Sequence, residues 1–80
     1  MSVTVLLFAS YADALGTSSL SVDLPRDATV ADLLADLRTR PGADRLPPAP
    51  LVAVNQRYAS ASSAVREGDE VAVIPPVAGG

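Results

Sequence analysis

The chain has 80 residues, which is enough for one compact domain, and its 49% apolar and 19% charged residues are typical of a globular protein. It has no cysteine and no histidine, which excludes disulfides, Cys/His metal sites and catalysis by a Ser-His or Cys-His pair. The net charge is −3 and the six basic residues, all arginine, form no cluster, so we expect no binding to nucleic acid or to a membrane.

The first quarter of the chain predicts a hairpin. Residues 3–9 are mostly β-branched or large and apolar, as in a strand covered on both faces. This run is too short to span a bilayer and lacks the basic start of a signal peptide, so we expect a cytoplasmic protein. Residues 10–16 predict a turn or a one-turn helix, and the alternating residues 19–24 predict a second strand with one solvent-exposed face.

The clearest predicted element is a helix that begins after Thr29. Four apolar residues fall at helical spacing and form one stripe: Val30, Leu33, Leu34 and Leu37. Thr29 is the expected N-cap, with Asp32 at the third helical position in a relaxed capping box. The helix should stop before Pro41-Gly42, and residues 41–50, with four prolines, predict an irregular surface connection.

The second half predicts short strands joined by turns. We expect a strand at residues 51–54, a turn at 55–57 and a short segment near residue 58. A loop at 60–65 and a turn at 67–69 should then lead into a last strand at 70–74. The resulting order is β-β-α-β-(β)-β, an α+β fold with one main helix on one face of a mixed four- to five-stranded sheet. With the first and last strands adjacent at its centre, this is a β-grasp (ubiquitin-like) roll. We place this domain at residues 1–74, followed by a flexible C-terminal tail at 75–80.

Two carboxylates and the tail are the candidates for chemistry. Asp32 and Asp36 are one helical turn apart, but no further ligands accompany them, so we expect a solvent-exposed face with Asp36 paired to Arg40 and no bound metal or cofactor. The tail ends in Gly79-Gly80. Two residues without Cβ fit a narrow tunnel, and the reactive group at the tip is the carboxylate of Gly80, which would need adenylation with ATP by a partner to become an acyl donor.

Several motifs together resemble those of one family, the small subunits of molybdopterin synthase. They are Phe8-Ala9…Leu15-Gly16, Val54-Asn55-Gln56, Glu67-Gly68-Asp69-Glu70-Val71 and Pro75-Pro76-Val77-Ala78-Gly79-Gly80. The resemblance spans essentially the whole chain, and its most specific part is the C-terminal end. At residues 11–15 the chain reads Tyr-Ala-Asp-Ala-Leu where charged residues are common in the family.

The resemblance implies a ubiquitin-like sulfur carrier that is a non-catalytic subunit of a heterotetrameric sulfurtransferase. Gly80 would be adenylated by an enzyme that resembles ubiquitin-activating adenylyltransferases, using ATP, and then converted to a thiocarboxylate. The tail, comprising Pro75, Pro76, Val77, Ala78 and Gly79, would insert into the large synthase subunit, where Gly80 would donate sulfur to cyclic pyranopterin monophosphate. The alternatives are a sulfur carrier for thiamine or cysteine biosynthesis, a ubiquitin-like protein modifier, and an interaction domain with an inert tail.

Strand alternation predicts where the partner binds. If residues 3, 5 and 7 face the helix, Phe8 points away from it, and Ile74 does the same in the last strand. In a β-grasp sheet these two residues would lie close together where the tail departs, with Tyr58 nearby. Phe8, Tyr58 and Ile74 therefore form the predicted partner interface, unless the connection 41–50 folds over them.

Overall fold

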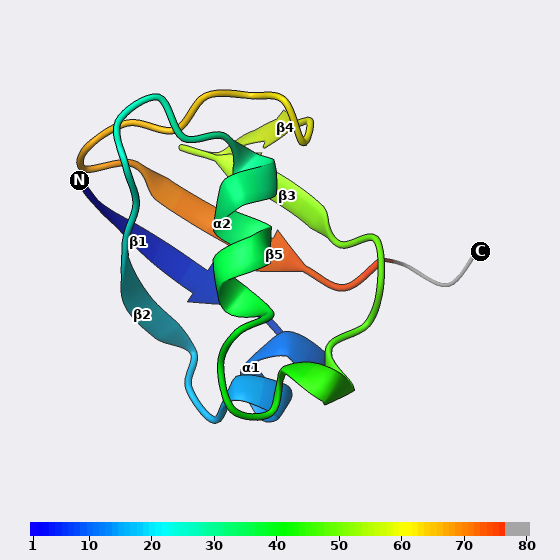
Figure 1. Ribbon diagram of the computed structural model, residues 1–80. Coiled ribbons are helices and arrows are strands. Elements are labelled where there is room, and N and C mark those ends of the chain that lie inside the picture. The colour runs from blue at the N-terminus through cyan, green and yellow to red at the C-terminus, as the bar shows by residue number, and fades with distance from the viewer. Residues whose placement is uncertain (77–80) are drawn as a thin grey trace.

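Residues 1–76, the part of the chain that the computed structural model describes, form a five-stranded mixed sheet with one main helix across one face (Figure 1). Within these described residues, eight elements follow one another: β1 (Ser2–Leu7), α1 (Ser10–Leu15), β2 (Ser19–Asp23), α2 (Val30–Leu37), the 3₁₀ turn η1 (Ala43–Arg45), β3 (Leu51–Val54), β4 (Arg57–Ala59) and β5 (Glu70–Ile74). The predicted β-grasp architecture is confirmed.

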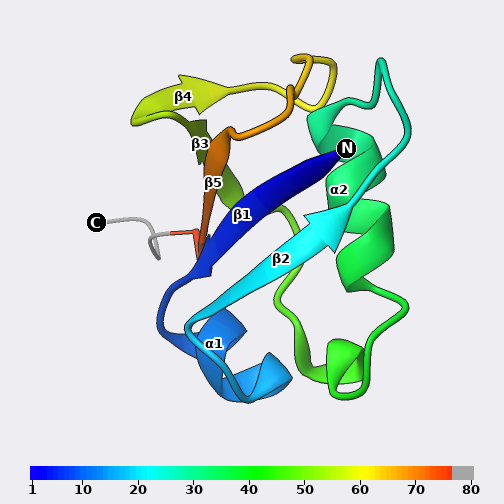
Figure 2. The same ribbon diagram turned by 90° about the vertical axis from the view of Figure 1, so that its left-hand side faces the viewer.

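The sheet has the strand order β2-β1-β5-β3-β4. β1 and β5, from opposite ends of the described chain, lie side by side at its centre and pair in parallel, with Leu7 opposite Val73. The neighbouring pairs, β1 with β2, β3 with β5 and β3 with β4, are antiparallel. Figure 2 shows α2 on one side of this sheet, so the sheet has one covered face and one open face.

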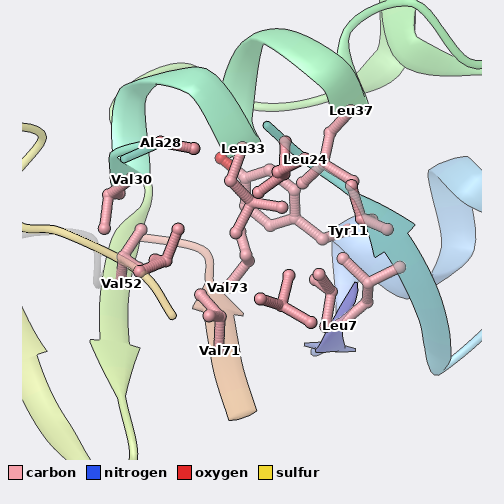
Figure 3. Packing of buried hydrophobic residues seen from close by; sticks show 14 residues of the cluster. Leu7, Tyr11, Leu24, Ala28, Val30, Leu33, Leu37, Val52, Val71 and Val73 are labelled. Carbon is pink, nitrogen blue, oxygen red and sulfur yellow. The ribbon is translucent and has the colours of Figure 1, made fainter. Parts of the chain in front are cut away.

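The core lies between the sheet and α2 (Figure 3). Every second residue of the two central strands points into it and is almost completely buried: Val3, Val5, Leu7, Val71 and Val73. The predicted alternation is therefore confirmed in both strands. From the helix, Leu33 is 0% exposed, whereas Leu34, which the spacing also placed on the stripe, is only partly buried. The apolar stripe is therefore centred on Leu33.

α2 begins with a complete capping box. The Thr29 hydroxyl accepts a hydrogen bond from the Asp32 backbone N–H, and the Asp32 carboxylate accepts one from the Thr29 N–H at 2.8 Å. Both bonds satisfy N–H groups that a helix start otherwise leaves without partners, and the acidic side chain also interacts favourably with the helix dipole.

The proline-rich connection 41–50 packs against α1. The Tyr11 hydroxyl donates a hydrogen bond to the Pro47 carbonyl, and the Arg45 guanidinium donates one to the Ala14 carbonyl at 3.2 Å. Gly42 has φ +89°, and a Cβ built on it would lie 2.0 Å from the Ala14 oxygen. Glycine is thus required at position 42 both by the backbone conformation and by the close approach of α1.

Two turns fix the start of β5. Asn55 and Gln56 both have positive φ (49° and 72°), as in the two-residue hairpin turn that matches strand twist. The Asn55 side chain reaches from this turn to Asp69 and Glu70, with hydrogen bonds of 2.9 and 3.0 Å. In the second turn, Gly68 has φ +84° and the Asp69 carboxylate accepts the Arg66 N–H at 2.8 Å.

Candidate functional site

Three large apolar side chains form one row across the open face of the sheet. The β1–β5 register, continued one residue past Leu7, places Phe8 beside Ile74, and the Phe8 N–H donates to the Val73 carbonyl at 3.3 Å. On its other side Ile74 pairs with Leu51, and the strand alternation puts all three side chains away from α2. Phe8 is 47% exposed and Leu51 39%, and Ile74 between them is partly buried. The structure thus brings Phe8 and Ile74 together at the end of β5, as the sequence predicted.

Tyr58 lies on the same face but in the next row. It pairs with Ala53, which pairs with Ala72 of β5, and the row continues to Leu6 of β1. β4 is an edge strand two strands away from β5, so at about 5 Å per strand Tyr58 is roughly 10 Å from the central strand. Its side chain is 78% exposed. Tyr58 therefore extends the apolar face sideways, two strands away from Ile74.

The apolar row is open because the connection 41–50 runs on the other side. Its contacts are with α1, and Leu46 packs against the core under α2. Figure 2 shows η1 on the same side of the sheet as α2. The alternative expectation, that this connection folds over the open face, is wrong, because Tyr11 and Gly42 anchor it to α1.

Leu51 belongs to this surface although sequence reasoning did not name it. The sequence signal was strand alternation, by which the neighbours Leu51 and Val52 point to opposite faces. Val52 is the buried one of the two. What the sequence lacked was the register that sets Leu51 beside Ile74. We call Phe8, Leu51, Tyr58 and Ile74 the apolar face.

The predicted tail begins where the apolar face ends. β5 stops at Ile74, and Pro75 and Pro76 follow it outside any strand, the first partly buried and the second exposed. The other predicted tail residues, Val77, Ala78, Gly79 and Gly80, lie outside the described residues. The division into a domain at 1–74 and a flexible tail at 75–80 stays a prediction.

The carboxylates of α2 have structural partners. Asp32 belongs to the capping box, and Asp36 forms a salt bridge of 3.0 Å with Arg40, as predicted. Within residues 1–76, no three acidic side chains cluster in a way that could hold a metal ion. In the same part of the chain, no helix is long and apolar enough to cross a membrane.

The described residues thus present an apolar face on the open side of the sheet, next to the end of β5. The sheet order, the parallel central pair and the single covering helix define the chain as a ubiquitin-like β-grasp protein. The chain belongs to the ThiS family, whose model matches residues 5–80 and so includes the C-terminal Gly79-Gly80.

A curated relative and several solved structures agree with this family. The molybdopterin synthase sulfur carrier subunit of Dictyostelium discoideum is 38% identical, over 95% of this chain and 93% of the relative. A protein of Pyrococcus furiosus described as a putative molybdopterin converting factor, subunit 1, has a TM-score of 0.83 at 30% identity, covering 95% of this chain and 98% of that one.

Two further structures bear on partners. Small archaeal modifier protein 1 of Haloferax volcanii has a TM-score of 0.81 at 30% identity, covering 95% of this chain and 98% of its own. A chain from the complex of subunits 1 and 2 of the molybdopterin-converting factor from Helicobacter pylori has a TM-score of 0.71 at 21% identity, covering 100% of both chains. At that identity the Helicobacter pylori structure shows a shared fold.

Proposed function

We propose that this protein is the sulfur-carrier subunit of a molybdopterin synthase and that the carboxylate of Gly80 carries the sulfur. The observation that carries the proposal is the match to the ThiS family along the chain up to residue 80, in a sequence that ends in Gly79-Gly80. Whole-length similarity to curated sulfur carrier subunits, such as that of Dictyostelium discoideum, supports the molybdopterin branch.

The chemistry follows from the state of a free carboxylate. At neutral pH it is an anion and a poor acyl donor. Attack of the carboxylate oxygen on the α-phosphorus of ATP forms an acyl-adenylate and releases pyrophosphate. A sulfide equivalent then displaces AMP at the carbonyl carbon and leaves a C-terminal thiocarboxylate. Its sulfur passes to cyclic pyranopterin monophosphate in the synthase.

In this scheme the chain is a co-substrate and the catalytic groups belong to its partners. An adenylating enzyme of the ubiquitin-activating type supplies the ATP-dependent step. The proposal includes a cytoplasmic carrier with no bound cofactor of its own. The large synthase subunit receives the tail formed by Pro75, Pro76, Val77, Ala78 and Gly79. Because glycine at position 79 has no Cβ, it would let the reacting group reach its site through a narrow tunnel in the partner.

Deletion of Gly80 tests the carrier role directly. The change removes one terminal residue, which lies outside the described part of the chain, so the folded domain and its melting temperature should stay nearly unchanged. The reacting carboxylate moves back by one residue, or roughly 3.3 Å, so thiocarboxylate formation and product formation should be lost. Mass spectrometry of the C-terminus measures thiocarboxylate formation, and the synthase reaction measures product formation. A truncated chain that still acquires sulfur and supports the reaction contradicts the proposal.

The apolar face is the proposed docking surface for the large subunit. Solvent-exposed apolar groups cluster there beside the start of the tail, and monomeric proteins seldom leave such patches unused. The structure from Helicobacter pylori, a complex of subunits 1 and 2, supports a partner of this kind.

Charge substitutions on this face provide the test. Phe8→Arg or Ile74→Arg should leave the chain folded but reduce binding to the large subunit by orders of magnitude, because an unpaired charge would be buried in the interface. Thr4→Arg is the matched control, since Thr4 lies exposed on the same face of β1, away from the apolar row. Unchanged copurification of both arginine variants, with folding verified by circular dichroism, removes this face from the interface.

A protein modifier is the second candidate. The similarity to small archaeal modifier protein 1 of Haloferax volcanii favours it, because both proteins share the fold over nearly their whole length. The two functions differ in the bond that Gly80 forms. Peptide mass spectrometry on material from the native host would find a C-terminal thiocarboxylate for the carrier and an amide to a lysine of another protein for the modifier.

A further inference from the structure

Ala9 has a backbone conformation that normally belongs to glycine. Its φ is 49° and its ψ is −120°, and the Tyr11 N–H donates a hydrogen bond of 3.0 Å to the Phe8 carbonyl across it. These are the features of a type II′ turn with Ala9 at its first central position, where φ is about +60° and ψ about −120° and where glycine is preferred because it has no Cβ. An alanine at this position is strained.

A second alanine at positive φ lies on the other side of β5. Ala49 has φ 51° and stands two residues before Leu51, which pairs with Ile74. Ala9 directly follows Phe8, which lies beside Ile74 on the β1 side. The two strained alanines therefore flank the end of β5, one at each end of the apolar row. Elsewhere in residues 1–76, positive φ occurs only at glycines and at three polar residues, Asp27, Asn55 and Gln56.

The strain of the two alanines is not compensated by packing within the described residues. Both alanines are exposed, and they belong neither to the buried core nor to the apolar residues packed against it. Glycine would adopt both conformations without strain and would lose no packing in the core. Backbone strain that the fold itself does not require is found at functional sites. The two methyl groups are therefore expected to make their contacts outside this domain.

We propose that the methyl groups of Ala9 and Ala49 contact the large synthase subunit and that these contacts compensate for the strain in the free chain. The inference rests on the proposed docking of that subunit on the apolar face. A partner that covers the row from Phe8 through Ile74 to Leu51 must also cover the two ends of the row, where the two alanines lie. Burial of one methyl group tightens binding by about fourfold.

Glycine substitutions should make the chain more stable and its complex weaker. In Ala9→Gly and Ala49→Gly the strain is removed, so the melting temperature of the isolated chain should rise by about 4 °C in each variant. The dissociation constant for the large subunit, measured by titration calorimetry, should increase about fourfold in each variant and about 16-fold in the double variant.

Asp27→Gly is the matched control. Asp27 is also exposed and at positive φ (66°), but it follows β2 at the opposite end of the sheet, where Asp23 pairs with Ser2. The substitution changes a positive-φ residue far from the apolar row, so it should leave the dissociation constant unchanged.

A D-alanine at position 9 separates the lost methyl contact from added flexibility of the turn. A D-residue adopts φ 49° and ψ −120° without strain, because the mirror-image values are relaxed for an L-residue. The turn therefore stays ordered while the methyl group points elsewhere. Binding of this chemically synthesised chain should weaken about as much as that of Ala9→Gly.

Three outcomes overturn the inference. A melting temperature that falls in both glycine variants shows that the alanines are not strained. Glycine variants that bind as tightly as the unmodified chain show that the methyl groups make no contact, and a D-alanine chain that binds as tightly shows that flexibility caused the loss. Failure of the proposed docking is recognised separately, by unchanged binding of Phe8→Arg.

Discussion

The side-chain amide of Asn55 donates a hydrogen bond of 2.9 Å to the carboxylate of Asp69, and this bond ties the tip of the β3–β4 hairpin to the turn that begins β5. The backbone of Asn55 bonds to Glu70 as well, at 2.8 Å. Both residues belong to motifs by which the sequence resembles its family. Their contacts are structural, since they set the register in which β3 and β5 pair and therefore place Leu51 beside Ile74.

Two substitutions at Asn55 separate its hydrogen bonds from its backbone conformation. Asn55→Gly keeps the positive φ of 49° accessible but removes the side-chain bonds, so the free energy of unfolding should fall by about 1–2 kcal/mol. Asn55→Ala should cost about 1 kcal/mol more, because alanine is strained at positive φ. Urea denaturation measures both. Equal stability of Asn55→Gly and the unmodified chain would show that the bonds to Asp69 and Glu70 contribute nothing.

Gly42 should tolerate no side chain. Gly42→Ala places a Cβ 2.0 Å from the Ala14 oxygen in addition to the strain at φ +89°, so we expect a loss of about 3 kcal/mol or more. Gly16→Ala is the control, because Gly16 also has positive φ (+74°) but no atom lies within 4 Å of its Cβ position, and it should lose only about 1 kcal/mol. Similar losses in thermal denaturation for the two variants would rule out the close contact with α1.

The centre of the helix stripe can be located by truncation. Leu33→Ala should cost about 2–5 kcal/mol, because Leu33 is fully buried among the side chains of the sheet. Leu34→Ala should cost less, about 1 kcal/mol, since Leu34 packs only at the border of the core. Chemical denaturation that finds Leu34 the more sensitive position would mean that α2 is rotated relative to this structure.

Stability should decrease at alkaline pH because of Tyr11. Burial raises the pKa of the Tyr11 phenol above its usual value of 10.0, and the nearby Arg38 charge only partly offsets this. Because this pKa is higher in the folded state than in the unfolded state, the contribution of Tyr11 to the free energy of unfolding is fully present below pH 10.0. It is lost as the pH rises toward the folded-state pKa. The chain has no lysine, so few other groups titrate in this range.

Tyr11→Phe should remove most of this alkaline dependence, at a cost of about 1 kcal/mol from the lost hydrogen bond to Pro47. The measurement is the free energy of unfolding between pH 8 and pH 11, with Tyr58→Phe as the control that removes the exposed phenol. If the alkaline loss of stability persists in Tyr11→Phe but disappears in Tyr58→Phe, the effect belongs to Tyr58 and the prediction is wrong.

Local patterns sufficed for the strands, α2 and its cap, because each depends on residues that are close in sequence. Thr29 and Asp32 are three residues apart, and the alternation in β1 and β5 directly predicted which residues are buried. The predicted first strand ran to residue 9, two residues too far, because Ala9 has φ 49° and turns the chain into α1.

What the sequence could not supply were the contacts between distant segments. The connection 41–50 has no periodicity, and its course depends on a hydrogen bond from Tyr11, 36 residues before Pro47. Likewise, Tyr58 was expected near Phe8 and Ile74, and only the position of β4 at the sheet edge shows that β3, with Ala53 in the same row, separates it from the central strand β5.

The parallel pairing of β1 with β5 also orders events during synthesis. β1 leaves the ribosome first, yet its central partner is residues 70–74, so the middle of the sheet can close only when nearly the whole chain has emerged. Until then Val3, Val5 and Leu7 have only the β2 hairpin and α2 as partners, and β3 and β4 have no strand that joins them to β1. Closing so long a loop costs chain entropy before its contacts form, which slows folding. Among the described strands, the last one to be made is thus the one that completes the sheet, and it immediately precedes the tail to which we assign the sulfur-carrying end.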